Sequence, residues 1–328
     1  MVRIRSIEVS PSLVNCSCAW ASDLSQLQEL YHCQYTGAVI TRTATLAGFA
    51  EDSSHTVAFL KDSLSSLNSY GYSPHSLATY LSWIRTLLEQ DPSSSKPFII
   101  SISDSSPVEI AAMLDSIQVL RKSQPGWQSR VAVEFNPSCP NIKGHPPPSY
   151  HFSGVSPFLD VFAKAFWEDE SLTIGLKLPP YVASTQFTEV IDGIAAYTRL
   201  DPSGQPRNPF AYFTCTNTLG NSLVFSELAV DGGAGVNQFA VPPGLGGLAG
   251  EAIHSLSLGN VYSFARLLAE SDDPAMREIV IIGAGGVTTP EAVERMHRAG
   301  AKAVGCATLL GKEGVAAFQR LAGRLAEE

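Results

Sequence analysis

Short hydrophobic runs alternate with longer amphipathic segments along almost the whole chain. The short runs are rich in aliphatic and β-branched residues, and eight of them have the length of strands: residues 13–17, 38–41, 98–103, 131–136, 173–178, 211–217, 278–282 and 303–306. The longer segments repeat apolar residues at helical spacing, at residues 23–30, 76–90, 107–122, 155–167, 184–197, 259–269, 289–298 and 314–326. Strands that alternate with helices in this order are typical of βαβ units and a parallel sheet.

Eight strands with intervening helices favour a closed (β/α)8 barrel, the TIM barrel of the α/β class, and we predict that residues 1–328 form one such domain. The open doubly wound sheet is the alternative, but it normally needs only about five or six strands. Three connections are unusually long, at residues 46–73, 137–153 and 220–250. Barrels build their active sites from loops at the C-terminal ends of the strands, so we expect functional residues there.

Composition and charge narrow the class of partner. The chain is 45% hydrophobic and 16% charged, which supplies a large core and gives no sign of wholesale disorder. Its 22 basic and 31 acidic residues give a net charge of −9, and the basic residues are scattered. Because nucleic-acid binding needs a positive patch to meet phosphates, we expect no nucleic-acid partner. A small anionic ligand needs only a few local cations and backbone N–H groups.

The N-terminal segment and the cysteines indicate a protein of the reducing cytoplasm. The segment lacks the apolar core of a signal peptide, and no run approaches the ~18 apolar residues of a membrane span. The six cysteines include no CxxC pair and are too sparse for a disulfide framework, so we expect free thiols. Neither the seven histidines nor a set of carboxylates gathers at predicted strand ends, which disfavours a metal site.

Glycine-rich turns lie at the ends of the last two predicted strands. Gly-Ala-Gly-Gly (283–286) follows the seventh strand, Gly-Cys-Ala (305–307) ends the eighth, and each precedes a helix. Backbone N–H groups and positive helix ends would meet there, where barrels often bind phosphate. The alternative is that these glycines only form tight turns.

Two side chains near predicted strand ends indicate chemistry. Lys177 lies in an otherwise apolar strand, and a lysine that points into a barrel needs an anionic partner or a functional reason. A lysine that reaches the surface from the strand end is the alternative. Cys139 follows the fourth strand on a proline-bounded loop, between Asn136 and Asn141. Its thiolate would be a base or nucleophile, whereas a cysteine taken alone is more often a small buried hydrophobic residue.

The strand-end motifs, in their order along the chain, resemble the class 1 dihydroorotate dehydrogenases, and in particular the soluble class with a cysteine base. Asn-Pro-Ser-Cys-Pro-Asn (136–141) resembles that family's catalytic loop. The resemblance covers nearly the whole chain, through Thr-Arg-Thr-Ala-Thr (41–45), Asn-Ser-Tyr-Gly (68–71), Gly-Leu-Lys-Leu-Pro-Pro-Tyr (175–181), Asn-Thr-Leu-Gly-Asn (217–221), Gly-Ala-Gly-Gly (283–286) and Gly-Lys-Glu-Gly (311–314). Each motif alone is a moderate signal, and the shared order makes the set specific.

The resemblance implies an FMN-dependent oxidation of dihydroorotate to orotate in pyrimidine biosynthesis. Cys139 matches the base that removes a proton from C5 of dihydroorotate, while a hydride passes from C6 to N5 of FMN. Lys177 matches the lysine beside the flavin ring. The positions that match substrate contacts are Asn68, Asn136, Asn141, Asn217 and Thr218. The positions expected at the flavin are Ser17, Arg42, Thr43, Asn136, Lys177, Thr216, Gly250, Gly285, Gly286, Gly305 and Cys306.

The resemblance also implies partners. The homodimeric subgroup reoxidises its flavin with fumarate at the same site, so we expect a homodimer that uses fumarate. Members that use NAD normally work with a second, iron–sulfur subunit, and this chain encodes no cysteine cluster of that kind.

Several positions depart from the family's pattern near the expected substrate and flavin. Position 42 is arginine where soluble members usually have lysine, and a planar fork is not equivalent to a point charge. The first strand end reads Asn-Cys-Ser-Cys (15–18) instead of Asn-Ala-Ser-Gly, and Tyr70 and Tyr72 make the substrate loop bulkier. Thr218 stands at a serine position and Cys306 at a threonine position. Two alternatives therefore stay open: a diverged paralogue that acts on another ring or enone, and a non-catalytic flavin-binding barrel.

Overall fold

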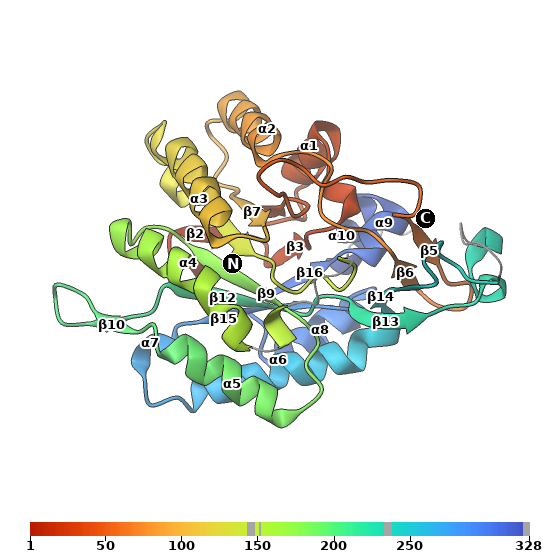
Figure 1. Cartoon of the computed structure of the whole chain (residues 1–328). Helices are drawn as coiled ribbons and strands as arrows, with labels where there is room; N and C mark the ends of the chain where they lie inside the picture. The colour runs from red at the N-terminus through yellow and green to blue at the C-terminus, as the bar shows by residue number, and fades with distance from the viewer. Residues whose placement is uncertain (143–147, 151, 233–237, 324–328) are drawn as a thin grey trace.

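Eight parallel strands form the central sheet, and they are the strands that the sequence predicts (Figure 1). The computed structural model describes residues 1–142, 148–150, 152–232 and 238–323. The strands are β3 (Leu13–Asn15), β4 (Val39–Ile40), β7 (Phe98–Ile102), β8 (Val131–Phe135), β9 (Ile174–Leu178), β12 (Phe210–Cys215), β15 (Val280–Ala284) and β16 (Ala303–Cys306). Their order, β3-β16-β15-β12-β9-β8-β7-β4, places each strand beside the one before it along the chain. This winding confirms the (β/α)8 barrel over the doubly wound alternative.

The barrel closes between β3 and β4. A parallel bridge joins Val14 to Ala38. Next to it the fully buried side chain of Asn15 replaces a backbone partner: its Nδ2 donates to the Ile40 carbonyl at 2.6 Å, and its Oδ1 accepts from the Ile40 N–H at 2.9 Å. One side-chain amide thus satisfies both polar groups of a residue at the seam.

Helices cover the outside of the barrel (Figure 1). They are α1 (Leu24–His32), α2 (Leu77–Gln90), α3 (Pro107–Lys122), α4 (Ser156–Glu168), α5 (Ser184–Ala195), α6 (His254–Ala269), α7 (Pro274–Arg277), α8 (Pro290–Ala299), α9 (Thr308–Glu313) and α10 (Ala316–Leu321). Side-chain oxygens cap several predicted starts, and Asp23 accepts from the N–H of Gln26 at 2.9 Å. The inner helix faces and the outer strand faces bury one large hydrophobic cluster, which includes Phe135.

A hairpin of β1 (Val2–Ile4) and β2 (Ile7–Val9) closes the lower end of the barrel, by which we mean the end where the barrel strands begin. The sequence did not predict this hairpin. Ile4, Ile7 and Val9 are fully buried and pack against the interior of the barrel. Above them the ring of Tyr212 occupies the space beside Gly175, where an added Cβ would lie 1.9 Å from the ring. Side chains therefore fill the lower half of the barrel, and a ligand site has to lie at the opposite end.

Two of the long connections form a second sheet instead of loops. β5 (Val57–Phe59) and β6 (Ser65–Asn68) come from the connection after β4, and β13 (Leu219–Leu223) and β14 (Leu245–Gly250) come from the connection after β12. They pair antiparallel in the order β13-β14-β6-β5, with Gly247 opposite Asn68. We call this four-stranded sheet the lid sheet. The third long connection contains residues 143–147 and 151, which lie outside the described residues.

The other differences from the predicted elements are local. α6 begins at His254 rather than at residue 259, and only α10 lies within the helix predicted at 314–326, whose last three residues lie outside the described residues. A small hairpin of β10 (Arg199–Leu200) and β11 (Pro206–Arg207) projects from the barrel (Figure 1). In the part of the chain that the structure describes, no helix is long and apolar enough to cross a membrane.

Candidate active site

A cavity of about 1020 Å³, counting the open space at its mouth, lies between the C-terminal ends of the barrel strands and the lid sheet. All but one of the predicted site residues line it: Ser17, Arg42, Thr43, Asn68, Asn136, Cys139, Asn141, Lys177, Thr216, Asn217, Thr218, Gly250, Gly285, Gly286 and Cys306. Gly305 does not line the cavity, because it faces Cys16, whose Sγ would lie 2.7 Å from an added Cβ.

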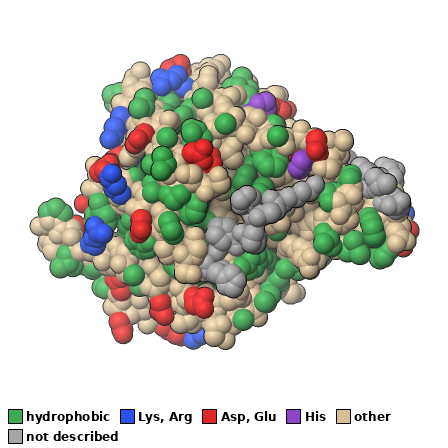
Figure 2. Space-filling model, viewed as in Figure 1, with side chains coloured by type: hydrophobic (Ala, Val, Ile, Leu, Met, Phe, Trp, Pro, Cys, Tyr) green, Lys and Arg blue, Asp and Glu red, His purple; other side chains and the backbone are tan. Residues whose placement is uncertain are grey.

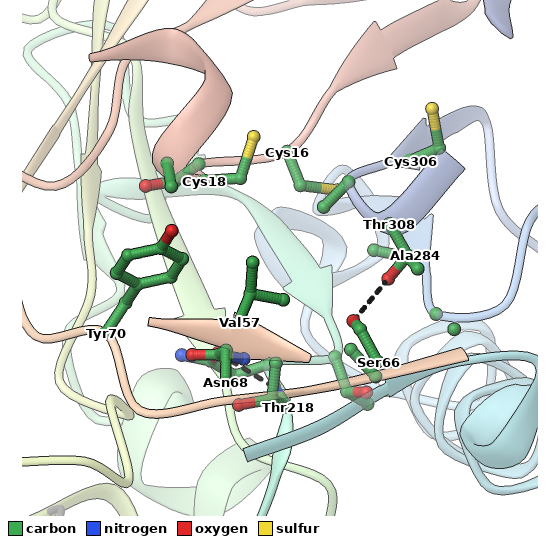
Figure 3. Close-up of a pocket in the computed structure, with 18 of the residues that line it drawn as sticks. Cys16, Cys18, Val57, Ser66, Asn68, Tyr70, Thr218, Ala284, Cys306 and Thr308 are labelled. Carbon is green, nitrogen blue, oxygen red and sulfur yellow. Dashed lines mark hydrogen bonds between the residues drawn. The ribbon is translucent and has the colours of Figure 1, made fainter. Parts of the chain in front are cut away.

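Figure 3 shows two opposite walls of this cavity. Three cysteines lie on one side and three residues of the lid sheet on the other: Cys16, Cys18 and Cys306, and Val57, Ser66 and Asn68. Burial raises the pKa of Cys16 to about 11 and that of Cys18 to about 12, so both thiols are neutral at pH 7 and serve as a small apolar wall. Val57 and Ser66 were not among the predicted site residues, because the sequence predicts a loop where β5 and β6 lie.

Four carboxamides form two hydrogen-bonded pairs in the cavity wall. Asn141 Nδ2 donates to Asn68 Oδ1 at 3.0 Å, and Asn68 Nδ2 donates to the Gly247 carbonyl of the lid sheet at 3.0 Å. In the second pair, Asn217 Nδ2 donates to Asn136 Oδ1 at 3.1 Å. These bonds fix the direction of each amide, and the remaining donor and acceptor positions suit a planar polar ring.

A threonine hydroxyl anchors the second pair to the barrel. Thr43 Oγ1 accepts from Asn136 Nδ2 at 2.8 Å and lies 2.9 Å from the hydroxyls of both Ser17 and Ser101. These contacts connect residues that follow β3, β4 and β8 with β7. The network therefore holds the loop that carries Cys139 at a fixed place on the rim of the barrel.

Cys139 lies in the loop after β8, partly buried, with its Sγ 4.0 Å from the Tyr70 carbonyl. Burial raises the pKa of this thiol, although the backbone N–H of Asn141 and the charges of Arg42 and Lys177 act in the opposite direction. The thiol is thus mostly protonated at neutral pH. Its thiolate, once formed, is correspondingly basic.

Lys177 on β9 is a buried cation at the cavity wall. It is 4% exposed, and its ammonium has no hydrogen-bond partner among the described residues. Glu134 on β8 is fully buried and accepts a hydrogen bond from Thr214 Oγ1 at 2.6 Å. Burial raises the pKa of Glu134, and the charge of Lys177 opposes that rise. A cation with free donors fits an electronegative atom of a ligand.

Backbone donors gather at another part of the cavity. Gly285 and Gly286 have φ of 121° and 67°, and their N–H groups, like that of Thr308 at the start of α9, have no acceptor within the described ranges. An added Cβ at Gly286 would lie 2.6 Å from His254 Cβ and 2.9 Å from the Gly250 carbonyl. Glycines that allow close approach and free N–H groups at a helix start together suit a phosphate.

Arg42 lines the cavity, but its charged end is already paired. Its guanidinium donates to the two carboxylate oxygens of Glu51 at 2.7 and 3.4 Å. The neighbouring loop residues Tyr70, Gly71 and Tyr72 also line the cavity, and their N–H groups have no acceptor in the described part of the chain. Consecutive free N–H groups suit a carboxylate. The sequence indicated the bulk of the two tyrosines but not these backbone donors.

Comparison with known proteins gives matches over most of the chain. Residues 14–328 match the family described as dihydroorotate dehydrogenase. One relative is a Streptococcus pneumoniae serotype 4 protein named probable dihydroorotate dehydrogenase A (fumarate). The two sequences are 30% identical over an alignment that covers 98% of this chain and 91% of that protein. The chain is 29% identical, over 89% of its length, to 81% of a Streptococcus agalactiae serotype Ia protein named putative dihydroorotate dehydrogenase A (fumarate). A Streptococcus pyogenes serotype M18 protein with the same name is 27% identical, over 95% of the chain and 88% of that protein.

Proposed function

The chain belongs to the dihydroorotate dehydrogenase family, as its motifs predict, and from this premise we propose that it oxidises dihydroorotate to orotate with bound FMN. The family is one of oxidoreductases, so the chain is an enzyme of that class. One observation carries the proposal: a single cavity brings together the Cys139 thiol, the Lys177 cation and a set of oriented carboxamides. None of these groups is needed to close the barrel.

The donors of the cavity fit a flavin mononucleotide. Its phosphate would accept from the free N–H groups of Gly285, Gly286 and Thr308, and its ring would place an electronegative edge at Lys177. The residues proposed to line the space between these ends include Ser17, Thr43, Thr216, Gly250 and Cys306. FMN, when bound, supplies the hydride acceptor, and the barrel supplies orientation and electrostatics.

Cys139 is proposed as the base that takes the proton from C5 of the substrate. A positioned base contributes ~10²–10⁴-fold to a rate, provided that the ring is held still. Asn68, Asn136, Asn141 and Asn217, with Thr218, are proposed to hold the ring. The free N–H groups of residues 70–72 would bind the carboxylate. Fumarate, which stands in the relatives' names, is also a carboxylate, and we propose it as the electron acceptor at the same donors.

A second candidate is a reaction on another ring or enone at the same site. The pairing of Arg42 with Glu51 favours it, because a neutralised guanidinium attracts a substrate carboxylate less than a free lysine would. Tyr70 and Tyr72 also take up space next to Cys139 that smaller residues would leave open.

We further propose that the chain works as a cytoplasmic homodimer in pyrimidine biosynthesis. Four hydrophobic side chains that are each at least 41% exposed lie on β13, on β14 or in the segment that connects them: Leu223, Leu228, Val230 and Leu245. Figure 2 shows hydrophobic surface at that end of the molecule, and no cluster of Lys and Arg among the described side chains on this face. Apolar patches of this kind mark contacts between proteins. Sedimentation velocity of the holoprotein tests the dimer.

The decisive experiment is anaerobic mixing of the purified holoprotein with dihydroorotate. Bleaching of the flavin absorbance, with orotate as the product, is the expected result. A yellow protein that stays oxidised with dihydroorotate, but is bleached by another dihydropyrimidine or has its chemically reduced flavin reoxidised by an enone, would favour the second candidate. A yellow protein that reacts with none of them would favour a non-catalytic flavin-binding barrel.

A further inference from the structure

The guanidinium of Arg42 is occupied by contacts with other residues of the chain and is not free to pair with a ligand. Its side chain is 7% exposed and that of Glu51 is 22% exposed, so the ion pair between them is largely shielded from water. Beyond the two bonds to Glu51, the guanidinium donates to the Gly71 carbonyl at 3.3 Å. Its Cζ also lies 5.1 Å from the centre of the Tyr70 ring. One side chain therefore holds the segment around residue 51 and the loop at residues 70–71 together.

The loop that Arg42 holds is in direct contact with the proposed base. The Tyr70 carbonyl accepts from Asn141 Nδ2 at 2.9 Å and lies 4.0 Å from Cys139 Sγ. The ring of Phe49 packs on the other side, where an added Cβ at Gly71 would lie 2.3 Å from it. A displacement of residues 70–71 would thus move an acceptor next to the thiol and the free N–H groups at the cavity wall.

We propose that Arg42 and Glu51 are positioning residues, which act as a clamp that holds residues 70–72 against Cys139. The clamp uses the planar fork of arginine, because one group meets a carboxylate, a carbonyl and a ring face at once, and a lysine ammonium lacks the fork that reaches both carboxylate oxygens of Glu51. The charge of Arg42 is balanced by Glu51 and not by the ligand. The kinetic consequences of this inference rest on the proposed function.

The clamp and a direct charge contact with the ligand predict opposite effects of removing Glu51. If Arg42 served mainly to attract an anionic substrate, loss of Glu51 would free its charge and tighten substrate binding. If the pair is a clamp, loss of either partner loosens the loop and weakens binding. In a clamp, the second substitution adds little to the first, since the contact is already lost.

The test is a double-mutant cycle on the holoenzyme with Arg42→Met, Glu51→Gln and the double variant. We expect each single variant to raise KM for dihydroorotate roughly tenfold with a smaller fall in kcat, and the double variant to resemble the singles. Flavin content should stay at the wild-type level in all three. The matched control is Glu270→Gln, which breaks an exposed ion pair with Arg266. The N–O distance of that pair is 2.8 Å, close to the 2.7 Å between Arg42 and Glu51, and its loss should change neither kinetic parameter. A lower KM in Glu51→Gln, or additive effects, would overturn the clamp.

A second measurement needs no turnover. Chymotrypsin acts after aromatic residues, and Phe49, Tyr70 and Tyr72 all lie in or beside the clamped loop. Native-state cleavage in this region should speed up several-fold in both single variants, with no further increase in the double variant and none in Glu270→Gln. If the wild-type protein fails to oxidise dihydroorotate, the proposed function is wrong, but the cleavage rates of the same variants still test the clamp. Unchanged or additive cleavage rates would refute the clamp even in an active enzyme.

Discussion

Glu134 and Lys177 are an acidic and a basic side chain, both buried, on the neighbouring strands β8 and β9. Thr214, which lies in register with Lys177 on β12, donates its hydroxyl to Glu134 Oε2 at 2.6 Å. Glu134 Oε1 has no hydrogen-bond partner within the described residues. The carboxyl is therefore only half satisfied, and burial raises its pKa above the ordinary value of 4.5, against the opposing influences of Lys177 and Thr214.

Glu134→Gln should change how stability depends on pH. A carboxyl whose pKa is raised on folding binds its proton more tightly in the folded state, so ionising it costs folding free energy. As pH rises from 4.5 through the raised pKa, the wild type should lose stability relative to Glu134→Gln, by about 1.4 kcal/mol for each unit of pKa difference. Urea unfolding at a series of pH values measures this. A difference that grows in favour of the wild type would mean that Lys177 keeps the carboxylate ionised.

Cys139→Ser should lower turnover by about 10²–10⁴-fold while FMN stays bound, because a serine hydroxyl ionises far less readily than a thiol and leaves almost no anion to act as the base. In the wild type, kcat/KM should continue to rise beyond pH 9.0, since burial raises the pKa of the thiol above that ordinary value. Steady-state rates between pH 6 and 10 test both statements. Cys33→Ser, outside the cavity lining, is the control and should keep wild-type rates. Near-normal activity of Cys139→Ser would remove the assignment of the base.

Lys177→Met should weaken FMN binding by roughly tenfold or more, because a buried cation with free donors loses its ligand contact. The flavin spectrum should shift as well, since the charge beside the ring disappears. Titration of apoprotein with FMN, followed by fluorescence, gives the affinity. The exposed Lys122→Met serves as the control. An unchanged affinity and spectrum would place Lys177 away from the flavin.

Gly286→Ala should destabilise the fold by about 1–3 kcal/mol and impair FMN retention, because a Cβ at φ of 67° would also lie 2.6 Å from His254 Cβ. Gly204→Ala is the matched control: its φ is 81°, but no atom lies within 4 Å of an added Cβ. The control should show only the backbone cost of about 1 kcal/mol and full FMN content. Thermal unfolding and the ratio of flavin to protein absorbance separate the two effects. Equal flavin loss in both would argue against the phosphate site.

The barrel could be predicted because each of its strands carries a local signal. A strand such as Ile174–Leu178, buried along its full length, reads as an apolar run bounded by turn residues. The lid strands carry no such signal: Leu219–Leu223 is half exposed, and Leu245–Gly250 holds three glycines. These strands form because segments far apart in the sequence pair with one another, and the spacing of hydrophobic residues within one segment carries no information about that pairing.

The lining of the cavity could be predicted where the residues lie at strand ends, since those ends converge in a barrel whatever the loops do. Lys177 and Asn136 are examples. Contacts made by loops were not predictable: nothing near Glu51 in the sequence indicates that it pairs with Arg42, and the free N–H groups of residues 70–72 follow from a backbone path. Gly305 was expected at the flavin from its motif; it does not line the cavity, and an added Cβ there would lie 2.7 Å from Cys16 Sγ.

Strand β14 has a further consequence for how the protein takes up the proposed flavin. From Gly247 to Gly250 it is paired with β6 along Asn68 to Ser65, and it ends beside the glycine turn of Gly286. A molecule lodged beneath this pairing gains a wider path to solvent whenever β6 and β14 separate. Loss of the proposed flavin on prolonged dialysis should therefore quicken when that sheet opens locally, and mild urea should accelerate it well before the barrel itself melts.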